Sequence, residues 1–182
     1  MNRAAFFALA AALAVGSPAS ALENENLLVS LPRGYKVGYQ KTTPKGSVSE
    51  MVPTNETVES WTEMVTVQIF LNVRGATPTQ YRDRLQKLWS NACADSEFAK
   101  VRDGIENGYA ALTWMQKCPV HPQSGKPEAT WLKAVQGRDS FYLVQKAFKF
   151  DPSAEQRREW GKFLEGVRVC DTRLPGRPCN LD

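Results

Sequence analysis

Histidine is almost missing from this chain, which carries one, His121, among its 182 residues. A single imidazole cannot build a histidine-rich zinc site, and any Ser-His-Asp arrangement would have to use this one residue. His121 lies in a loop rich in proline and glycine, near Ser124 and Glu128, and no serine sits in a G-x-S-x-G turn. We therefore expect His121 to be a solvent-exposed loop residue, and we predict no metal site.

The chain also lacks the glycine-rich motifs G-x-x-x-x-G-K-[ST] and G-x-G-x-x-G. Without them, nucleotide binding has no support, and we predict no cofactor and no identifiable catalytic residue. Glu56, Glu59 and Glu63 do cluster near Trp61, as acids of a glycosidase would across a cleft. We expect them to be solvated, because they flank the start of a strand. A hydrolase with dispersed active-site residues, centred on His121 or one of these acids, stays an alternative.

Strong charge of one sign is absent as well. The chain has 23 Lys and Arg against 19 Asp and Glu, a net charge of +4, and the two signs are interspersed. The densest basic cluster, Arg157, Arg158 and Lys162, is typical of a solvated helix face. Nucleic-acid binding proteins usually gather such residues on one face, so we expect no nucleic-acid partner.

Long apolar runs occur only at the beginning of the chain. Arg3 precedes the apolar stretch 4–15, Gly16, Ser17 and Pro18 follow, and residues 19–21 read Ala-Ser-Ala. This is the layout of a secretory signal peptide, and the apolar run is shorter than the roughly 20 residues of a spanning helix. We predict a signal peptide over 1–21, cleaved before Leu22, and one exported domain over 22–182 with no integral membrane segment. The destination is the periplasm or the exterior.

The chain has four cysteines and no C-x-x-C pair: Cys93, Cys118, Cys170 and Cys179. An even number in an exported chain indicates two disulfides, and the spacings do not fit structural zinc sites. Of three possible connectivities we favour Cys93–Cys118 and Cys170–Cys179. The second pair would close the C-terminal tail, which has little apolar material of its own.

Alternating apolar and polar residues predict strands at 27–31, 35–41, 47–52, 64–73, 109–118, 129–135 and 140–150, with a weaker one near 98–102. A helix should begin after Thr77, where Pro78 and Gln80 complete a capping box, and close at Cys93. Ser153 and Gln156 open a second helix, and the tail from Cys170 should be irregular. The fold class is therefore α+β, a mostly antiparallel sheet of about six strands covered by two helices.

This order of hairpins, helix, meander and helix resembles the PsbP-like fold, an α/β/α sandwich of extrinsic photosystem subunits and bacterial envelope proteins. The stretches Glu59-Ser60-Trp61-Thr62-Glu63-Met64 and Cys170-Asp171-Thr172-Arg173 resemble a family of small secreted proteobacterial proteins. The resemblance implies the fold and export from a Gram-negative cell, and it implies no activity.

Aromatic side chains are the remaining functional candidates. Trp89 and Trp160 lie on helix stripes and should be core residues. A surface for a ligand or partner could use Tyr35, Tyr39, Trp61, Trp114 and Trp131, with core packing as the competing role. We predict a monomeric, non-catalytic envelope protein that binds a partner protein or a small ligand. Besides the hydrolase, a protease inhibitor or chaperone that uses the Cys170–Cys179 loop is the alternative.

Overall fold

The protein's structure, a computed structural model, describes residues 23–177 and Cys179. The predicted signal peptide and its cleavage point before Leu22 lie outside the described residues. Among the described residues, no helix is long and apolar enough to cross a membrane.

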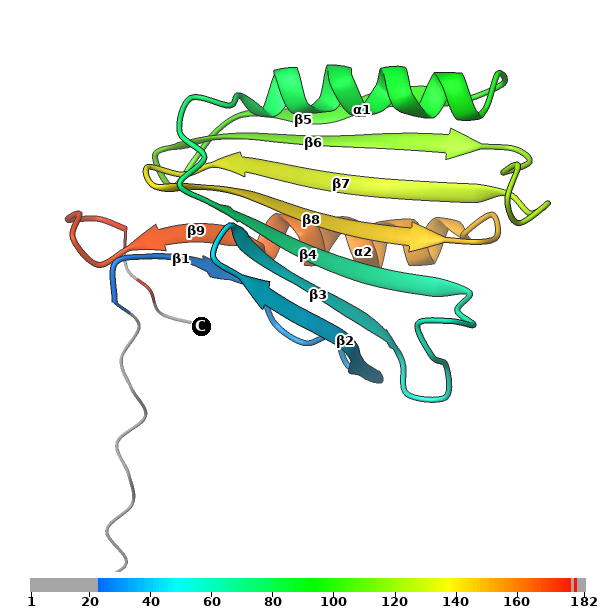
Figure 1. The fold of residues 1–182 in the computed structure, drawn as a ribbon, viewed down its shortest axis with the longest axis horizontal. Helices are drawn as coiled ribbons and strands as arrows, with labels where there is room; N and C mark the ends of the chain where they lie inside the picture. Colours follow the sequence, from blue (N-terminus) through cyan, green and yellow to red (C-terminus); the bar gives the residue numbers. More distant parts are fainter. Residues whose placement is uncertain (1–22, 178, 180–182) are drawn as a thin grey trace, which may run out of the picture.

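A seven-stranded antiparallel sheet forms the centre of the fold, in the order β2-β3-β4-β8-β7-β6-β5 (Figure 1). Its strands are β2 (Tyr35–Thr43), β3 (Gly46–Pro53), β4 (Glu63–Leu71), β5 (Glu97–Glu106), β6 (Tyr109–Cys118), β7 (Glu128–Gln136) and β8 (Ser140–Phe148). Neighbours along the chain pair as hairpins, except that β4 lies beside β8. Two further strands, β1 (Glu25–Leu28) and β9 (Arg168–Asp171), form a separate small antiparallel sheet.

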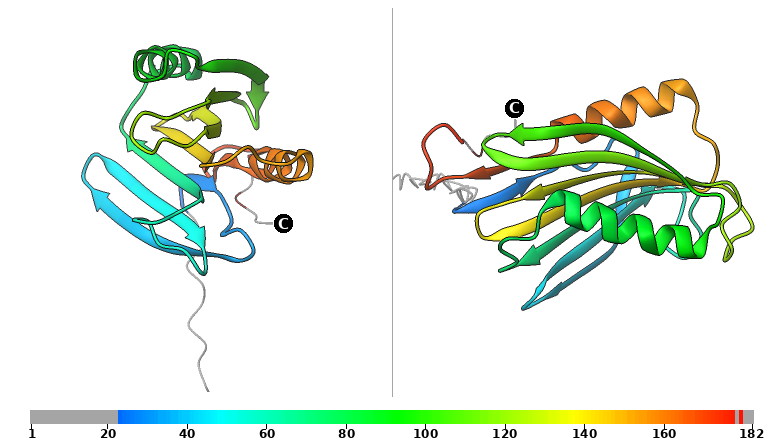
Figure 2. Two further views of the ribbon diagram at one scale, coloured as in Figure 1. Left: turned by 90° about the vertical axis from the view of Figure 1, so that its right-hand side faces the viewer. Right: turned by 90° about the horizontal axis from the view of Figure 1, so that it is seen from above.

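Two helices cover opposite faces of the large sheet (Figures 1 and 2). Helix α1 (Pro78–Ala92) lies over β6 and β7, and α2 (Ala154–Gly166) lies on the other face, beside the small sheet. Both N-termini carry the predicted capping boxes, Thr77 with Gln80 and Ser153 with Gln156. These caps satisfy backbone N–H groups that have no partner inside the helix.

Successive side chains of β8 point to opposite faces of the sheet and contribute to two separate hydrophobic cores. Phe141 and Leu143 point toward α1, whereas Val144 and Phe148 point toward α2. The α1 core consists of Leu112, Trp114, Leu132, Ala134, Phe141 and Leu143. The α2 core consists of Met51, Val65, Val67, Val144, Phe148, Trp160, Leu164 and Val167. Because both of its faces are covered, β8 is buried at eight of its nine positions.

Both predicted disulfides are present. Cys93, directly after α1, is bonded to Cys118 at the end of β6, and Cys170 of β9 is bonded to Cys179. The first ties the end of α1 to the sheet it covers. The second closes the tail against the small sheet.

The α+β class is confirmed, and the expectation of an irregular tail from Cys170 is wrong at its start. Cys170 and Asp171 belong to β9, whose partner β1 begins at Glu25. Since β9 contains four residues and pairs with a strand some 140 positions away, local alternation gives little sign of it. The Glu25 carboxylate also accepts hydrogen bonds from the backbone N–H groups of Arg138, Asp139 and Ser140 and from Tyr142 Oη, which fixes β1 to the β7–β8 turn.

Candidate functional site

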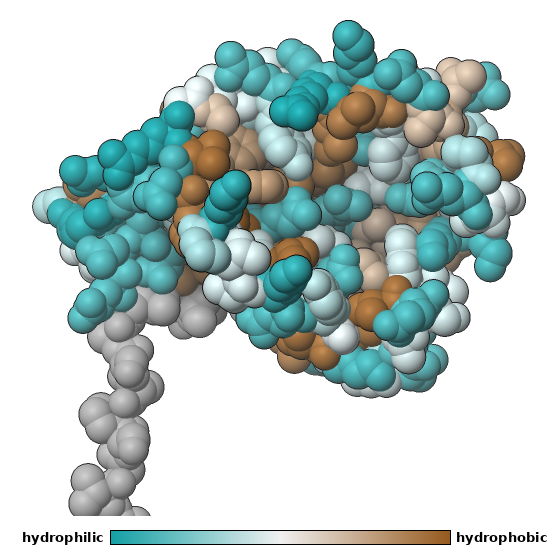
Figure 3. All heavy atoms as spheres, in the orientation of Figure 1, coloured by the Kyte–Doolittle hydropathy of each residue, from teal (hydrophilic) through white to brown (hydrophobic). Residues whose placement is uncertain are grey.

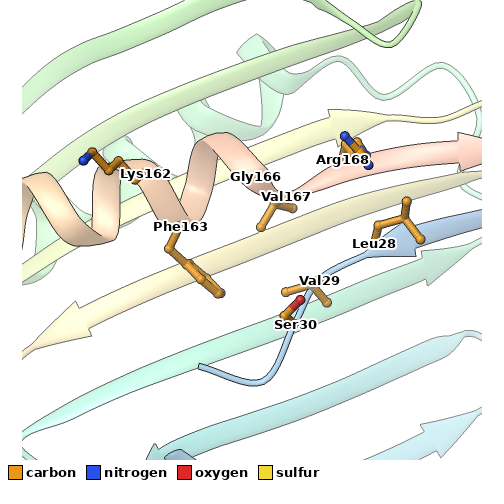
Figure 4. Close-up of a pocket in the computed structure, with 8 residues that line it drawn as sticks. All are labelled: Leu28, Val29, Ser30, Lys162, Phe163, Gly166, Val167 and Arg168. Atoms are coloured by element: carbon orange, nitrogen blue, oxygen red, sulfur yellow. The ribbon is translucent and has the colours of Figure 1, made fainter. Parts of the chain in front are cut away.

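A crevice runs between helix α2 and the segment 28–35 that leads from β1 into β2. It consists of two hollows of about 300 and about 270 Å³ that share Phe163. Figure 4 shows the first, with Val29 and Ser30 on one side and Phe163 on the other. Its remaining lining residues are Leu28, Lys162, Gly166, Val167 and Arg168; the second hollow is lined by Pro32, Arg33, Tyr35, Glu63, Gln156, Glu159, Trp160 and Phe163. We call the two hollows together the α2 crevice.

A buried lysine lies beneath the second hollow. The side chain of Lys146 is 0% exposed, and its Nζ donates hydrogen bonds to Tyr35 Oη at 2.5 Å and to Glu63 Oε2 at 2.6 Å. The same Nζ lies 3.8 Å from the ring centroid of Trp160, a favourable cation–π distance. Two hydrogen bonds and a cation–π contact thus hold the ammonium group inside the protein.

Burial dominates the electrostatics of this cluster. Desolvation lowers the pKa of Lys146 to about 8, although the hydrogen bond and charge of Glu63 act in the opposite direction. Desolvation also raises the pKa of Tyr35, and Glu63 raises it further. Because its side chain is fully buried, Lys146 does not contact a ligand in the crevice itself. It holds the Glu63 carboxylate and the Tyr35 phenol, which do line the crevice, in fixed positions.

Strand alternation explains how the cluster is assembled. On β8, Val144, Lys146 and Phe148 share the face toward α2. Tyr35 begins β2 and Glu63 begins β4, which lie on either side of β3, and both side chains reach this face from the starts of their strands. The sequence did contain a signal for this cluster: Lys146 occupies an inward position of an otherwise apolar alternation, where a lysine is rare without a partner.

A second buried lysine secures the helix that forms the crevice wall. Lys133, with a side chain 1% exposed, donates to the carbonyl oxygens of Leu164 at 2.9 Å and Val167 at 2.7 Å, and it pairs with Glu106 at 2.5 Å. Burial lowers the pKa of Lys133, and Glu106 opposes that shift. The ammonium group thereby satisfies carbonyls at the C-terminal end of α2 and fixes that end to the sheet.

The five aromatic residues proposed from the sequence do not form one surface. Tyr35 lines the α2 crevice, and Trp131 is half-buried on the same face of the sheet, packed edge-to-face against Phe148. Tyr39 is exposed on the edge strand β2, and Trp61 lies under Lys149 Nζ at 3.8 Å. Trp114 is fully buried in the α1 core, where Nε1 donates to Gln116 Oε1 at 3.3 Å.

His121 is more enclosed than the sequence suggested, since its side chain is only 20% exposed. Its ring lies 6.2 Å from that of Trp89, and its Nε2 is 3.9 Å from a carboxylate oxygen of Glu128. The backbone N–H of Gln123 donates to His121 Nδ1. The enclosure has a local cause: the loop turns back on the end of α1, whereas proline and glycine content alone predicted a solvated turn.

The three glutamates proposed for a hydrolase make different contacts and do not act as one group. Glu56 accepts hydrogen bonds from the backbone N–H and the hydroxyl of Thr62 at 2.8 and 2.5 Å. Partial burial raises the pKa of Glu56, but the bonds from Thr62 outweigh it and leave the pKa lowered. Glu63 is held by Lys146, and Glu59 is exposed. Among the described residues, no group of three or more His, Cys, Asp or Glu side chains could hold a metal ion.

Comparison with known proteins gives similar structures and no family. No family model matches this sequence, and neither does any curated protein. Solved structures similar to it include a point mutant of the protein Mog1 (10% identity, 75% of this chain and 78% of that one, TM-score 0.46). They also include the Ran-binding protein Mog1p of Saccharomyces cerevisiae (11%, 85% and 87%, TM-score 0.43). A third is the PsbP of the cyanobacterium Synechocystis (11%, 90% and 98%, TM-score 0.45), a protein of the kind that the order of elements resembles. Identities of this size and TM-scores below 0.5 carry no argument about what this chain binds.

Proposed function

We propose that this chain is an exported binding protein that holds a small organic ligand in the α2 crevice. In this account the signal peptide is removed before Leu22, and the remainder acts as one monomeric domain in the periplasm or outside the cell. The two disulfides support export, because such bonds persist in oxidising compartments. The observation that carries the binding role is the rigid polar cluster of Lys146, Glu63 and Tyr35 at the base of an open crevice.

The lining of the α2 crevice indicates the chemistry of the ligand. Trp160 and Phe163, with ring centroids 5.2 Å apart, offer an aromatic wall for an apolar portion. Glu63 and Tyr35 supply fixed polar groups beside it, and Arg33 and Glu159 add charge of both signs. Ligand sites commonly combine an apolar wall with a few well-placed polar groups. We expect an amphiphilic molecule that occupies both hollows, with a polar group near Glu63 in the second and an apolar part that passes Phe163 into the first.

The same cluster is the strongest feature for the alternative, a hydrolase, because it contains groups with shifted pKa values in a cleft. Its contacts favour binding over catalysis. Lys146 Nζ is buried and bonded to Tyr35 and Glu63, and the Glu63 carboxylate is already paired with it. A nucleophile or general base has to reach the reacting atom of a substrate. Neither group meets that requirement without giving up its present partner.

The Cys170–Cys179 loop, the contact element of a possible inhibitor or chaperone, packs against its own protein. The guanidinium of Arg177 lies 4.3 Å from the ring centroid of Tyr109 and donates to the carbonyl of Gly108. Arg173 joins Asp171 and Asp139 at 2.7 and 2.6 Å. These contacts favour a structural role for the loop.

A crevice-filling variant tests the proposal. Ser30 is exposed and lines the first hollow, so Ser30→Trp should fill it with little effect on folding. Ser90, exposed on α1, gives the matched control Ser90→Trp. NMR spectra of the labelled protein would be recorded during titration with amphiphilic amines, carboxylates and alcohols that are long enough to occupy both hollows. We expect saturable shifts at the Trp160 indole N–H in the wild type and in Ser90→Trp but not in Ser30→Trp. Saturable shifts gathered elsewhere, or none at all, would contradict the proposal.

A further inference from the structure

The opposite face of the sheet carries a second hollow that the proposed function does not use. Helix α1 covers β6 and β7 and leaves the same face of β3 and β4 open (Figure 1). Two depressions of about 310 and about 220 Å³ lie along this side of the helix and share Phe70. The first is lined by Phe70, Tyr81, Arg84, Leu85 and Leu88, and the second by Lys41, Thr43, Lys45, Gly46, Ser47, Val48, Gln68, Ile69 and Phe70. We call them together the α1 groove.

The α1 groove is apolar along its length. Leu88 is 57% exposed on the helix side although α1 has a core to pack against. Phe70, Tyr81 and Leu85 are only partly buried where they meet the α1 core. Figure 3, drawn in the orientation of Figure 1, shows patches of brown apolar surface between teal hydrophilic residues on this side of the molecule. An exposed apolar strip rimmed by polar groups is typical of an interaction site.

The backbone holds the strand side of the groove in shape. Gly46, at φ +152°, begins β3, and an added Cβ would lie 2.0 Å from the carbonyl oxygen of Ile69. Only glycine permits this close approach of β3 and β4. The Lys45 carbonyl accepts a hydrogen bond from the Leu71 N–H at 2.9 Å, which closes the same corner. Lys45 is therefore presented from a well-defined turn, beside Lys41 of β2.

Charge around the α1 groove has one sign. The charged side chains of its lining are Lys41 and Lys45 at the hairpin end and Arg84 at the helix end, and all three are exposed. No acid lines either depression. Glu50, two positions beyond Val48 on the same face of β3, is the nearest acid along that strand and lies outside the lining. An apolar strip with cations only is complementary to a molecule that joins a hydrocarbon chain to an anionic group.

We propose that the α1 groove binds a free long-chain carboxylate. The hydrocarbon chain lies over Phe70 toward Leu85 and Leu88, and the carboxylate meets Lys41 and Lys45, where two cations stand together. This site lies on the other face of the sheet from the α2 crevice, so the inference does not depend on the proposed function.

The test uses dodecanoate as the probe, at concentrations below micelle formation, with calorimetry on the full mature chain. We expect saturable binding of one dodecanoate and much weaker binding of dodecylamine, which has the same chain and the opposite charge. Lys45→Glu should weaken dodecanoate binding about fivefold, the effect of roughly 1 kcal/mol from one exposed ion pair. Leu88→Gln, at the other end, should weaken it about fourfold, which corresponds to roughly 0.8 kcal/mol for one methylene group that is no longer buried.

Matched controls separate this site from other sources of binding. Arg158→Glu makes the same charge change on α2, and Val120→Gln alters an apolar side chain that is 65% exposed outside the groove. Both should bind dodecanoate as the wild type does. Equal binding of dodecylamine, or no saturable binding, would overturn the inference. Loss of dodecanoate binding in Ser30→Trp but not in Lys45→Glu would also overturn the inference, because dodecanoate would then bind in the α2 crevice. Binding to anionic phospholipid vesicles without binding of dodecanoate would point to a membrane surface instead.

Discussion

The buried ammonium of Lys146 should make the protein more stable as pH rises above neutrality. The pKa of Lys146 is about 8 in the folded chain against 10.5 for an unperturbed lysine. Between these values the unfolded chain binds more protons than the folded chain, so the free energy of unfolding increases with pH. With these two pKa values, linkage gives a gain of about 1 kcal/mol between roughly pH 7 and pH 9.

Urea unfolding at several pH values measures this gain. Lys146→Met keeps the length of the side chain and removes the titrating group, so the variant should lose about 1 kcal/mol of the wild-type increase. Lys87→Met, an exposed lysine on α1, is the control and should keep the full increase. Lys133 is buried and has a lowered pKa as well. It contributes with the same sign to all three proteins and cancels in the comparison.

A direct titration covers the case in which Lys146→Met does not fold. Following the Cε–H signal of Lys146 by NMR in the wild type should give a midpoint about 8. The reasoning is refuted if that midpoint lies at or above the ordinary lysine value. It is also refuted if Lys146→Met and wild type show the same dependence of unfolding free energy on pH.

Three further predictions concern the contacts that fix the fold. Replacing Cys170 and Cys179 by alanine should lower the free energy of unfolding by about 2.5 kcal/mol, the value for a loop of about ten residues, and an unchanged urea midpoint would argue against the chain-entropy origin. Glu25→Gln should cost about 2 kcal/mol, because one carboxylate accepts hydrogen bonds from three backbone N–H groups and Tyr142; hydrogen exchange at the β7–β8 turn should rise, and exchange that stays at the wild-type rate would contradict the anchoring role. Thr77→Ala removes the cap of α1 and should cost about 1 kcal/mol in thermal unfolding, whereas the exposed Thr79→Ala control should change it little.

The sequence predicted the strands and helix ends that depend on residues close together in the chain. The alternation over 109–118 coincides with β6, and both capping boxes lie where Ser, Thr and Gln spacing placed them. Pairing of Cys93 with Cys118 followed from the helix end and the strand end that carry them. The small sheet was not predicted, because it forms by pairing of the short strands β1 and β9, which lie at opposite ends of the domain sequence.

Only part of the candidate site could be predicted from the sequence. Tyr35 was proposed for a binding surface and lines the α2 crevice. Trp160 was assigned to the core, and it is both a core residue and a wall of the crevice. Lys146 and Glu63 meet because β4 and β8 are neighbours in the sheet, and that neighbourhood depends on strand order. Motif reading cannot give strand order, and an isolated lysine in an apolar strand was the only sign of it.

Native mass spectrometry of the protein purified without denaturation from its own host tests the binding role most directly. We predict a chain that begins at Leu22, is lower by the four hydrogens of two disulfides, and carries a small additional mass that leaves on denaturation. Ser30→Trp purified in the same way should lack that mass, and Ser90→Trp should keep it. A bare chain in the wild type, or an additional mass that Ser30→Trp retains in full, would contradict the account.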